Sequence, residues 1–154
     1  MQMTLSPTFW RSIASKTVLG VALIGSLAGA TTASAQSPAD GATLDATKLK
    51  SQKTPVQCTG DQTVTLDGAL LQVGRTAINA SGNCKVQVMN SRVVGKIAVV
   101  ATGNAEITFE NAIVEGSLQL MGNTTASFKS STVTGKVRKL QSAAVKDLGH
   151  NVWH

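Results

Sequence analysis

The side chains that could take part in catalysis or metal binding are few in this sequence. Its 154 residues include two cysteines, two histidines and eight acidic residues. Glu106 and Glu110 are the most closely spaced carboxylates in the central part of the chain, and glycoside hydrolysis needs two carboxylates about 5–10 Å apart, one with a raised pKa. The alternating pattern around them places both on an outer, solvated face, where nothing raises a pKa. We therefore interpret them as solubilising residues.

The two histidines are the other candidates for a site. His150 and His154 lie four residues apart at the C-terminus, a spacing that binds a metal only from a helix. Because Gly149 disfavours a helix there, we expect no metal, no cofactor and no catalytic residue.

The first 35 residues are typical of a signal peptide. Arg11 and Lys16 precede and flank an apolar run over residues 17–30, and Ala33-Ser34-Ala35 fits a small-x-small cleavage site. Cleavage there makes Gln36 the first mature residue. The alternative is an uncleaved anchor helix, but the run is short of the roughly 20 residues that span a membrane. We expect export to the periplasm or the extracellular space, with no membrane span after cleavage.

Export favours a disulfide between Cys58 and Cys84, the only two cysteines. The bridge closes a loop of 27 residues, which stabilises the fold by on the order of 3–4 kcal/mol in the chain-entropy model. A metal site or a redox pair is the alternative, and it is weaker because the sequence has no Cys-x-x-Cys and the histidines are distant.

The charge pattern excludes several classes of protein. Charged residues make up 14% and aromatic residues 3% of the chain, too few charges for a coiled coil and few aromatics for a stacked carbohydrate cleft. Without residues 1–35, twelve Lys and Arg face eight Asp and Glu, a net +4 over 119 residues. This mild excess is not clustered as in nucleic-acid-binding proteins, so we expect no nucleic-acid partner.

An internal repeat of about 20 residues is the most informative feature. Gly-Asn pairs begin at residues 82, 103 and 122, and a second glycine follows each first glycine by thirteen positions, at Gly95, Gly116 and Gly135. A degenerate first copy begins at Gly60-Asp61. Between these glycines apolar and polar residues alternate with period two, which predicts three short strands in each copy.

Repeats of this length that form three strands each predict an all-β fold, a short parallel β-helix of about four turns over residues 58–140. Like residues should stack in columns, with Val93, Val114 and Val133 inside and the Asp61–Asn83–Asn104–Asn123 column bonded from turn to turn at one corner. An antiparallel sandwich of hairpins is the alternative, but it does not explain the constant internal spacing.

The motifs Cys58-Thr59-Gly60 and Gly82-Asn83-Cys84, with the later Gly-Asn pairs, resemble a family of small exported bacterial proteins. It is catalogued as a domain of unknown function, number 3060 in its series. The resemblance covers about residues 56–137. It implies an exported β-rich domain and provides no activity, ligand or catalytic residue.

The segments on either side of the repeats differ from them in composition. Residues 36–57 are polar and aperiodic, so we expect a flexible segment. Residues 141–154 are predicted to form a capping tail, with one or two helical turns ended by Gly149. The side chains available to cover the end of the β-helix are Leu140, Val145, Leu148 and Trp153, and Trp153 is interpreted as a packing residue in preference to a ligand-stacking one.

One group of basic residues suggests a binding role. Lys96 and Lys136 occupy the same bend of two copies with Ser117 between them, and Arg138 and Lys139 follow. Such a ridge suits an anionic ligand. We expect a monomeric, non-enzymatic structural or interaction module of the bacterial envelope, with an anionic envelope polymer or another envelope protein as partner. The alternative is a carbohydrate-active or carbohydrate-binding domain with a shallow site on the β-helix face.

Overall fold

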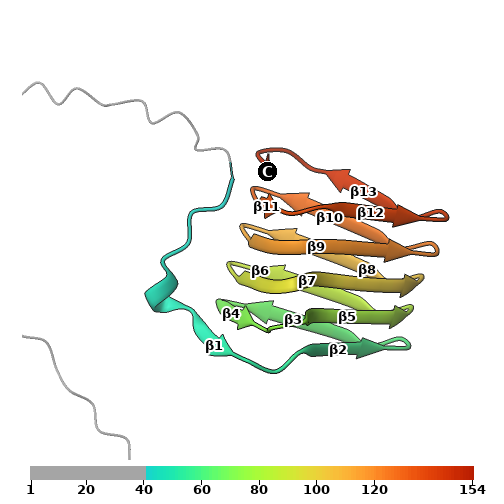
Figure 1. Cartoon of the computed structure of the whole chain (residues 1–154), viewed down its shortest axis with the longest axis horizontal. Helices are drawn as coiled ribbons and strands as arrows, with labels where there is room; N and C mark the ends of the chain where they lie inside the picture. The colour runs from blue at the N-terminus through green and yellow to red at the C-terminus, as the bar shows by residue number, and fades with distance from the viewer. Residues whose placement is uncertain (1–40) are drawn as a thin grey trace, which may run out of the picture. The chain divides into compact units, whose positions relative to one another are not determined.

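The chain forms a parallel β-solenoid, as its repeats predict. The computed structural model describes residues 41–154, so the predicted signal peptide and the start of the mature chain at Gln36 lie outside the described residues. The solenoid has about five turns, stacked from β2 at one end to β13 at the other (Figure 1).

Each turn contributes strands to three faces, which we name after a strand of the first turn. The β3 face is a five-stranded sheet of β3 (Thr63–Asp67), β6 (Lys85–Met89), β8 (Glu106–Glu110), β10 (Thr125–Lys129) and β13 (Ala144–Asp147). The β4 face contains β1 (Lys50–Gln52), β4 (Ala69–Gln72), the first halves of β7 (Arg92–Gly103) and β9 (Ile113–Met121), β11 (Thr132–Thr134) and β14 (Val152–Trp153). The β2 face contains β2 (Val56–Thr59), β5 (Thr76–Gly82), the second halves of β7 and β9, and β12 (Val137–Leu140).

The core consists of columns of like residues, because alternate side chains of every strand point inward. Val93, Val114 and Val133 are in register and fully buried, as predicted. On the β3 face Phe109 and Phe128 stack with ring centroids 4.8 Å apart and an interplanar angle of 6°. These columns bury apolar surface that no single turn could cover alone.

The corners use residues that tolerate a left-handed backbone. Asn90, Asn111 and Ser130 bend the chain after the β3 face with φ of 48°, 49° and 48°, a conformation in which asparagine is enriched. The Asp61–Asn83–Asn104–Asn123 column forms at the corner that precedes the β3 face, as predicted. Each asparagine donates its Nδ2 to the side-chain oxygen one turn below, at 2.7, 2.9 and 3.2 Å.

A second ladder was not anticipated from the sequence. Asn90 donates its Nδ2 to Asp67 at 3.0 Å, and Asn111 donates to Asn90 at 2.9 Å. The two ladders border the β3 face on its two sides and hold successive turns in register.

The C-terminal segment corrects the predicted capping tail. Residues 141–154 contain no helical turn; they continue the solenoid, with β13 paired to β10 and β14 paired to β11. The predicted four turns therefore become about five. The register places Trp153 over Val133 in an inward column. The ring of Trp153 contacts the ring of Phe128 edge-on, with centroids 5.0 Å apart, which confirms its packing role.

Within residues 41–57, the part that the structure describes, the N-terminal segment also differs from the flexible segment predicted over residues 36–57. A short 3₁₀ helix, η1 (Ala46–Lys48), precedes β1, which pairs with β4, and β2 pairs with β5. Gly41 donates its N–H to the carbonyl of His150 at 2.8 Å, so this segment runs from the last turn to the first (Figure 1). Backbone pairing along an open sheet edge explains the order that composition did not reveal.

Candidate functional site

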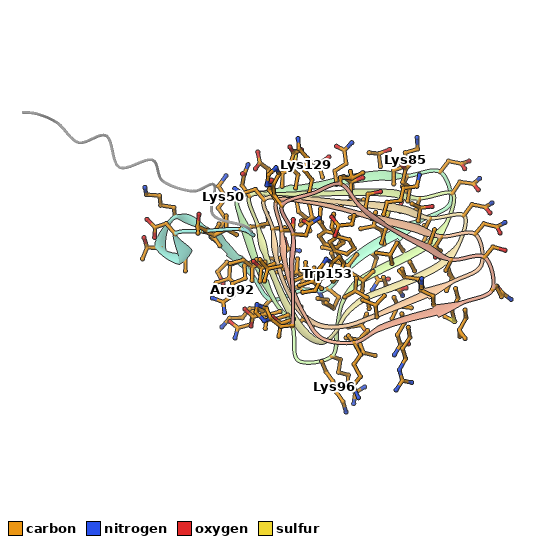
Figure 2. All side chains as sticks on the ribbon, turned by 90° about the horizontal axis from the view of Figure 1, so that it is seen from above. Lys50, Lys85, Arg92, Lys96, Lys129 and Trp153 are labelled. Atoms are coloured by element: carbon orange, nitrogen blue, oxygen red, sulfur yellow. A yellow bond between two sulfur atoms is a disulfide. The ribbon has the colours of Figure 1, made fainter. Side chains whose placement is uncertain are left out.

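The predicted basic ridge lies in part at the corner between the β4 and β2 faces. The backbone bends there at Gly95, Gly116 and Gly135, which stack so closely that a Cβ on Gly116 would overlap the carbonyl oxygen of Gly95. Of the residues that follow these glycines, Lys96 and Lys136 are exposed and Ser117 is partly buried. Figure 2 shows Lys96 projecting outward from this corner.

We define the basic corner as the column of residues at this bend: Arg75, Lys96, Ser117 and Lys136. Thr76 pairs with Ile97, which sets Arg75 beside Lys96. On the next turn the Ser117 hydroxyl donates a hydrogen bond to the carbonyl of Lys96 at 3.3 Å. Lys136 follows on the next turn, where its carbonyl accepts from the N–H of Leu118 at 2.9 Å. The three basic side chains are exposed.

Arg75 is a member that sequence reasoning missed. Its signal was the pair Gly74-Arg75, which matches Gly95-Lys96. The first copy has fourteen positions between Gly60 and Gly74 where the later copies have thirteen, so the two pairs did not align by counting.

The remaining residues of the predicted ridge lie elsewhere. Arg138 pairs with Gln119 and points outward on the β2 face, while Lys139 pairs with Leu120 and so occupies a core column. Lys139 remains exposed because its turn is the last one. The four predicted residues therefore divide between the basic corner, the β2 face and the open end.

The acidic residues of the alternative hypothesis are engaged in ion pairs between turns. Glu106 Oε2 lies 3.9 Å from Lys85 Nζ, on the turn below, and Glu110 Oε1 lies 2.7 Å from Lys129 Nζ, on the turn above. The two glutamates are the first and last residues of β8, so their Cα atoms are about 13 Å apart. Each carboxylate points to a different lysine, one on the turn below and one on the turn above, so the two do not converge on one point as paired glycosidic carboxylates do.

A third ion pair lies on the β4 face. The Nη2 and Nε atoms of Arg92 lie 2.6 and 2.8 Å from Glu115 Oε1, and both side chains are about one-third exposed. Together with the pairs of Glu106 and Glu110, it links charges of turns two, three and four. The middle of the solenoid is thus close to neutral.

Cys58 and Cys84 form the predicted disulfide. The first lies in β2, the second precedes β6, and both are fully buried with Cα atoms 5.9 Å apart. A buried disulfide is typical of proteins from oxidising compartments. Within residues 41–154 there is no pocket, no cluster of three or more metal-ligating side chains, and no helix long and apolar enough to span a membrane.

Comparison with known proteins returned no family. No family model, no curated protein and no solved structure matches this chain. The resemblance to the exported family of unknown function stays a prediction, and function has to be argued from the surface itself.

Proposed function

We propose that this protein is an exported, non-enzymatic interaction module of the bacterial envelope that binds an anionic envelope polymer through its basic corner. The observation that supports this is the column of Arg75, Lys96 and Lys136 along one corner. Between residues 41 and 154, no carboxylate oxygen lies within ion-pairing distance of these three side chains, whereas Lys85, Arg92 and Lys129 are all paired.

The geometry of the column suits a linear ligand. Adjacent parallel strands are about 4.8 Å apart, so Arg75 and Lys96 are neighbours and Lys136 follows two turns further on. Because the glycine stack fixes the backbone, the cations are already aligned and binding needs little ordering of the main chain. A polymer with repeated negative charges could therefore contact several of them at once.

Export is supported by two independent features. The first is the signal-peptide pattern of residues 1–35, and the second is the buried Cys58–Cys84 disulfide. Intact-mass measurement of exported material tests this directly. A mature chain starting at Gln36 is expected, and retention of residues 1–35 would contradict the periplasmic or extracellular address.

The second candidate function is neutral carbohydrate binding on the β3 face. Thr65, Gln87 and Thr108 are in register there and point outward, and hydroxyl and amide groups suit the hydroxyls of a sugar. Binding of this kind should resist salt, whereas binding at the basic corner should weaken as salt rises.

The experiment compares polyphosphate with neutral glycans as probes. Arg75→Gln, Lys96→Gln and Lys136→Gln combined should weaken polyphosphate binding by about tenfold or more. The matched control combines Lys48→Gln, Lys50→Gln and Lys53→Gln, which remove the same charge from exposed positions of the N-terminal segment. If both variants lost the same affinity for polyphosphate, the loss would follow from net charge alone, and this would contradict a binding site at the basic corner.

A further inference from the structure

The exposed large apolar side chains of the described chain gather on the last turn of the solenoid, residues 136–154. Leu140 is 58% exposed, Leu148 is 55% exposed and Trp153 is 40% exposed. Leu140 ends β12 and Leu148 follows β13, so the leucines lie at the two ends of the last strand of the β3 face. Exposed leucines concentrated at one end of a domain indicate a contact surface more than isolated ones do.

Basic charge is concentrated on the same turn. The last turn has four basic residues, Lys136, Arg138, Lys139 and Lys146, and one acidic residue, Asp147. The carboxylate of Asp147 accepts hydrogen bonds from the N–H of Gly149 and from Asn151 and Trp153. The first turn instead has Asp61 and Asp67, and the turns between are linked by ion pairs. Positive charge therefore lies at the end where the leucines are exposed.

Two core positions of the last turn argue against a protein strand as the occupant of this end. Lys139 continues the column of Leu120, and Asp147 continues the column of Phe128. A further layer of strands, from a second copy or another protein, would bury both charged groups, which is unfavourable without partners. Inward-pointing charges at a sheet edge are a known means of blocking edge-to-edge association.

We propose that the last turn docks end-on against an anionic lipid surface. In that orientation the four basic side chains reach the lipid phosphates, and Leu140 and Leu148 enter the boundary between headgroups and acyl chains. Long basic side chains can extend to the lipid headgroups while neighbouring apolar residues lie deeper in the membrane. Tryptophan also favours the membrane interface. Proteins that bind to the surface of an anionic membrane combine basic charge with exposed apolar side chains in this way.

This surface is separate from the basic corner and shares only Lys136 with it. A polymer along the corner needs cations alone, whereas an end-on lipid contact also needs the leucines. The two proposals can therefore fail independently.

The test is vesicle co-sedimentation with the disulfide-bonded unit 36–154, which forms one compact body. Vesicles of phosphatidylglycerol and phosphatidylcholine in equal parts should bind the protein, and vesicles of phosphatidylcholine alone should bind it far less. Trp153 is the single tryptophan of this unit, so its fluorescence should shift to the blue on the anionic vesicles. Equal binding to the two kinds of vesicle would overturn the proposal.

Variants separate the apolar contribution from the charge. Leu140→Ser with Leu148→Ser should weaken binding to anionic vesicles by about fivefold or more and leave polyphosphate binding unchanged. Because both side chains are more than half exposed, the fold should persist, which thermal melting checks. The control with the same two substitutions elsewhere is Leu44→Ser with Leu49→Ser, at partly buried positions of the N-terminal segment.

The outcomes of these variants are distinct. Vesicle binding unchanged in the Leu140/Leu148 variant would show attachment by charge alone and overturn the docking proposal. Loss of polyphosphate binding in the Arg75/Lys96/Lys136 variant tests the basic corner. A protein that binds vesicles but not polyphosphate supports the lipid contact and contradicts the proposed function.

Discussion

The indole N–H of Trp153 donates a hydrogen bond to the carboxylate of Asp147 at 3.1 Å, across the open end of the solenoid. The same carboxylate accepts from the N–H of Gly149 at 2.9 Å and from Asn151 Nδ2 at 2.6 Å. Asn151 also donates to the carbonyl of Phe128 at 2.8 Å. These bonds hold the segment between β13 and β14 together and keep the Trp153 ring against Phe128 at the end of the core.

Acid should weaken the hydrogen bonds that the Asp147 carboxylate accepts. The N–H of Gly149, followed by Asn151 and Trp153, holds the pKa of Asp147 below its ordinary value of 3.8. A lowered folded-state pKa stabilises the fold above 3.8, and this contribution disappears as the pH falls through the lowered value. We expect Trp153 fluorescence of the 36–154 unit to change in that acidic range. Asp147→Asn should remove this transition, and an identical acid profile in the two proteins would contradict the role of the carboxylate.

The glycine column predicts a sharp contrast between two alanine substitutions. Gly116 has a φ of 127°, and its Cβ would overlap the Gly95 backbone, while a Cβ at Gly74 meets nothing within 4 Å. Gly116→Ala should lower the free energy of unfolding by about 2–4 kcal/mol through overlap and backbone strain. Gly74→Ala, at the same bend of the first turn, should change it by less than about 0.5 kcal/mol. Urea unfolding measures both, and similar stabilities would show that the turns are not packed this closely.

The fold was predictable because the repeat constrains it at every level. The thirteen-residue spacing of glycines fixes the corners, and period-two alternation fixes the inward residues, so the stacking of Val93 on Val114 follows from counting. Side-chain ladders were only partly predictable. The Asn83–Asn104–Asn123 column was visible in the Gly-Asn pairs. The Asp67–Asn90 hydrogen bond was not, because Asp67 lies seven positions after the first glycine of its copy and Asn90 lies eight positions after that of the next copy.

The two ends were not predictable, because their strands lack the repeat's signals. At the last corner Gln141-Ser142 replaces Gly-Asn, and Gln141 itself adopts a φ of 63°. The residues around Ala144 suggested a helix by propensity, but pairing with β10 provides hydrogen bonds that an isolated helical turn could not match. The same holds for β1, a polar segment ordered by the free edge of β4. Two of the three cations of the basic corner, Lys96 and Lys136, were therefore predictable. The inclusion of Arg75 and the separation of Arg138 and Lys139 from the corner required the structure.

The disulfide should contribute measurably to stability. Cys58 and Cys84 are fully buried, so the native protein should show no titratable thiol until it is unfolded and reduced. Replacing both with alanine should lower the free energy of unfolding by on the order of 3–4 kcal/mol, because the bridge restricts a 27-residue loop in the unfolded chain. Urea unfolding of the two proteins measures the difference. One or two free thiols in the unreduced native protein would contradict the bridge.

Adjacent residues of β11 provide the most direct test of the column register. Val133 is fully buried between Val114 and Trp153, whereas Thr134, the next residue, is exposed beside Glu115. Val133→Asp places an unpaired carboxylate in the core column and should lower the free energy of unfolding by roughly 3–5 kcal/mol. Thr134→Asp introduces the same group in solvent and should change it by less than about 0.5 kcal/mol, apart from weak repulsion by Glu115. Both variants introduce the same carboxylate and the same change of charge at neighbouring positions, so the inward or outward direction of the side chain is the main difference between them. Equal destabilisation would place both residues in similar environments, and the alternation on which the solenoid's faces, its basic corner and its last turn depend would be wrong.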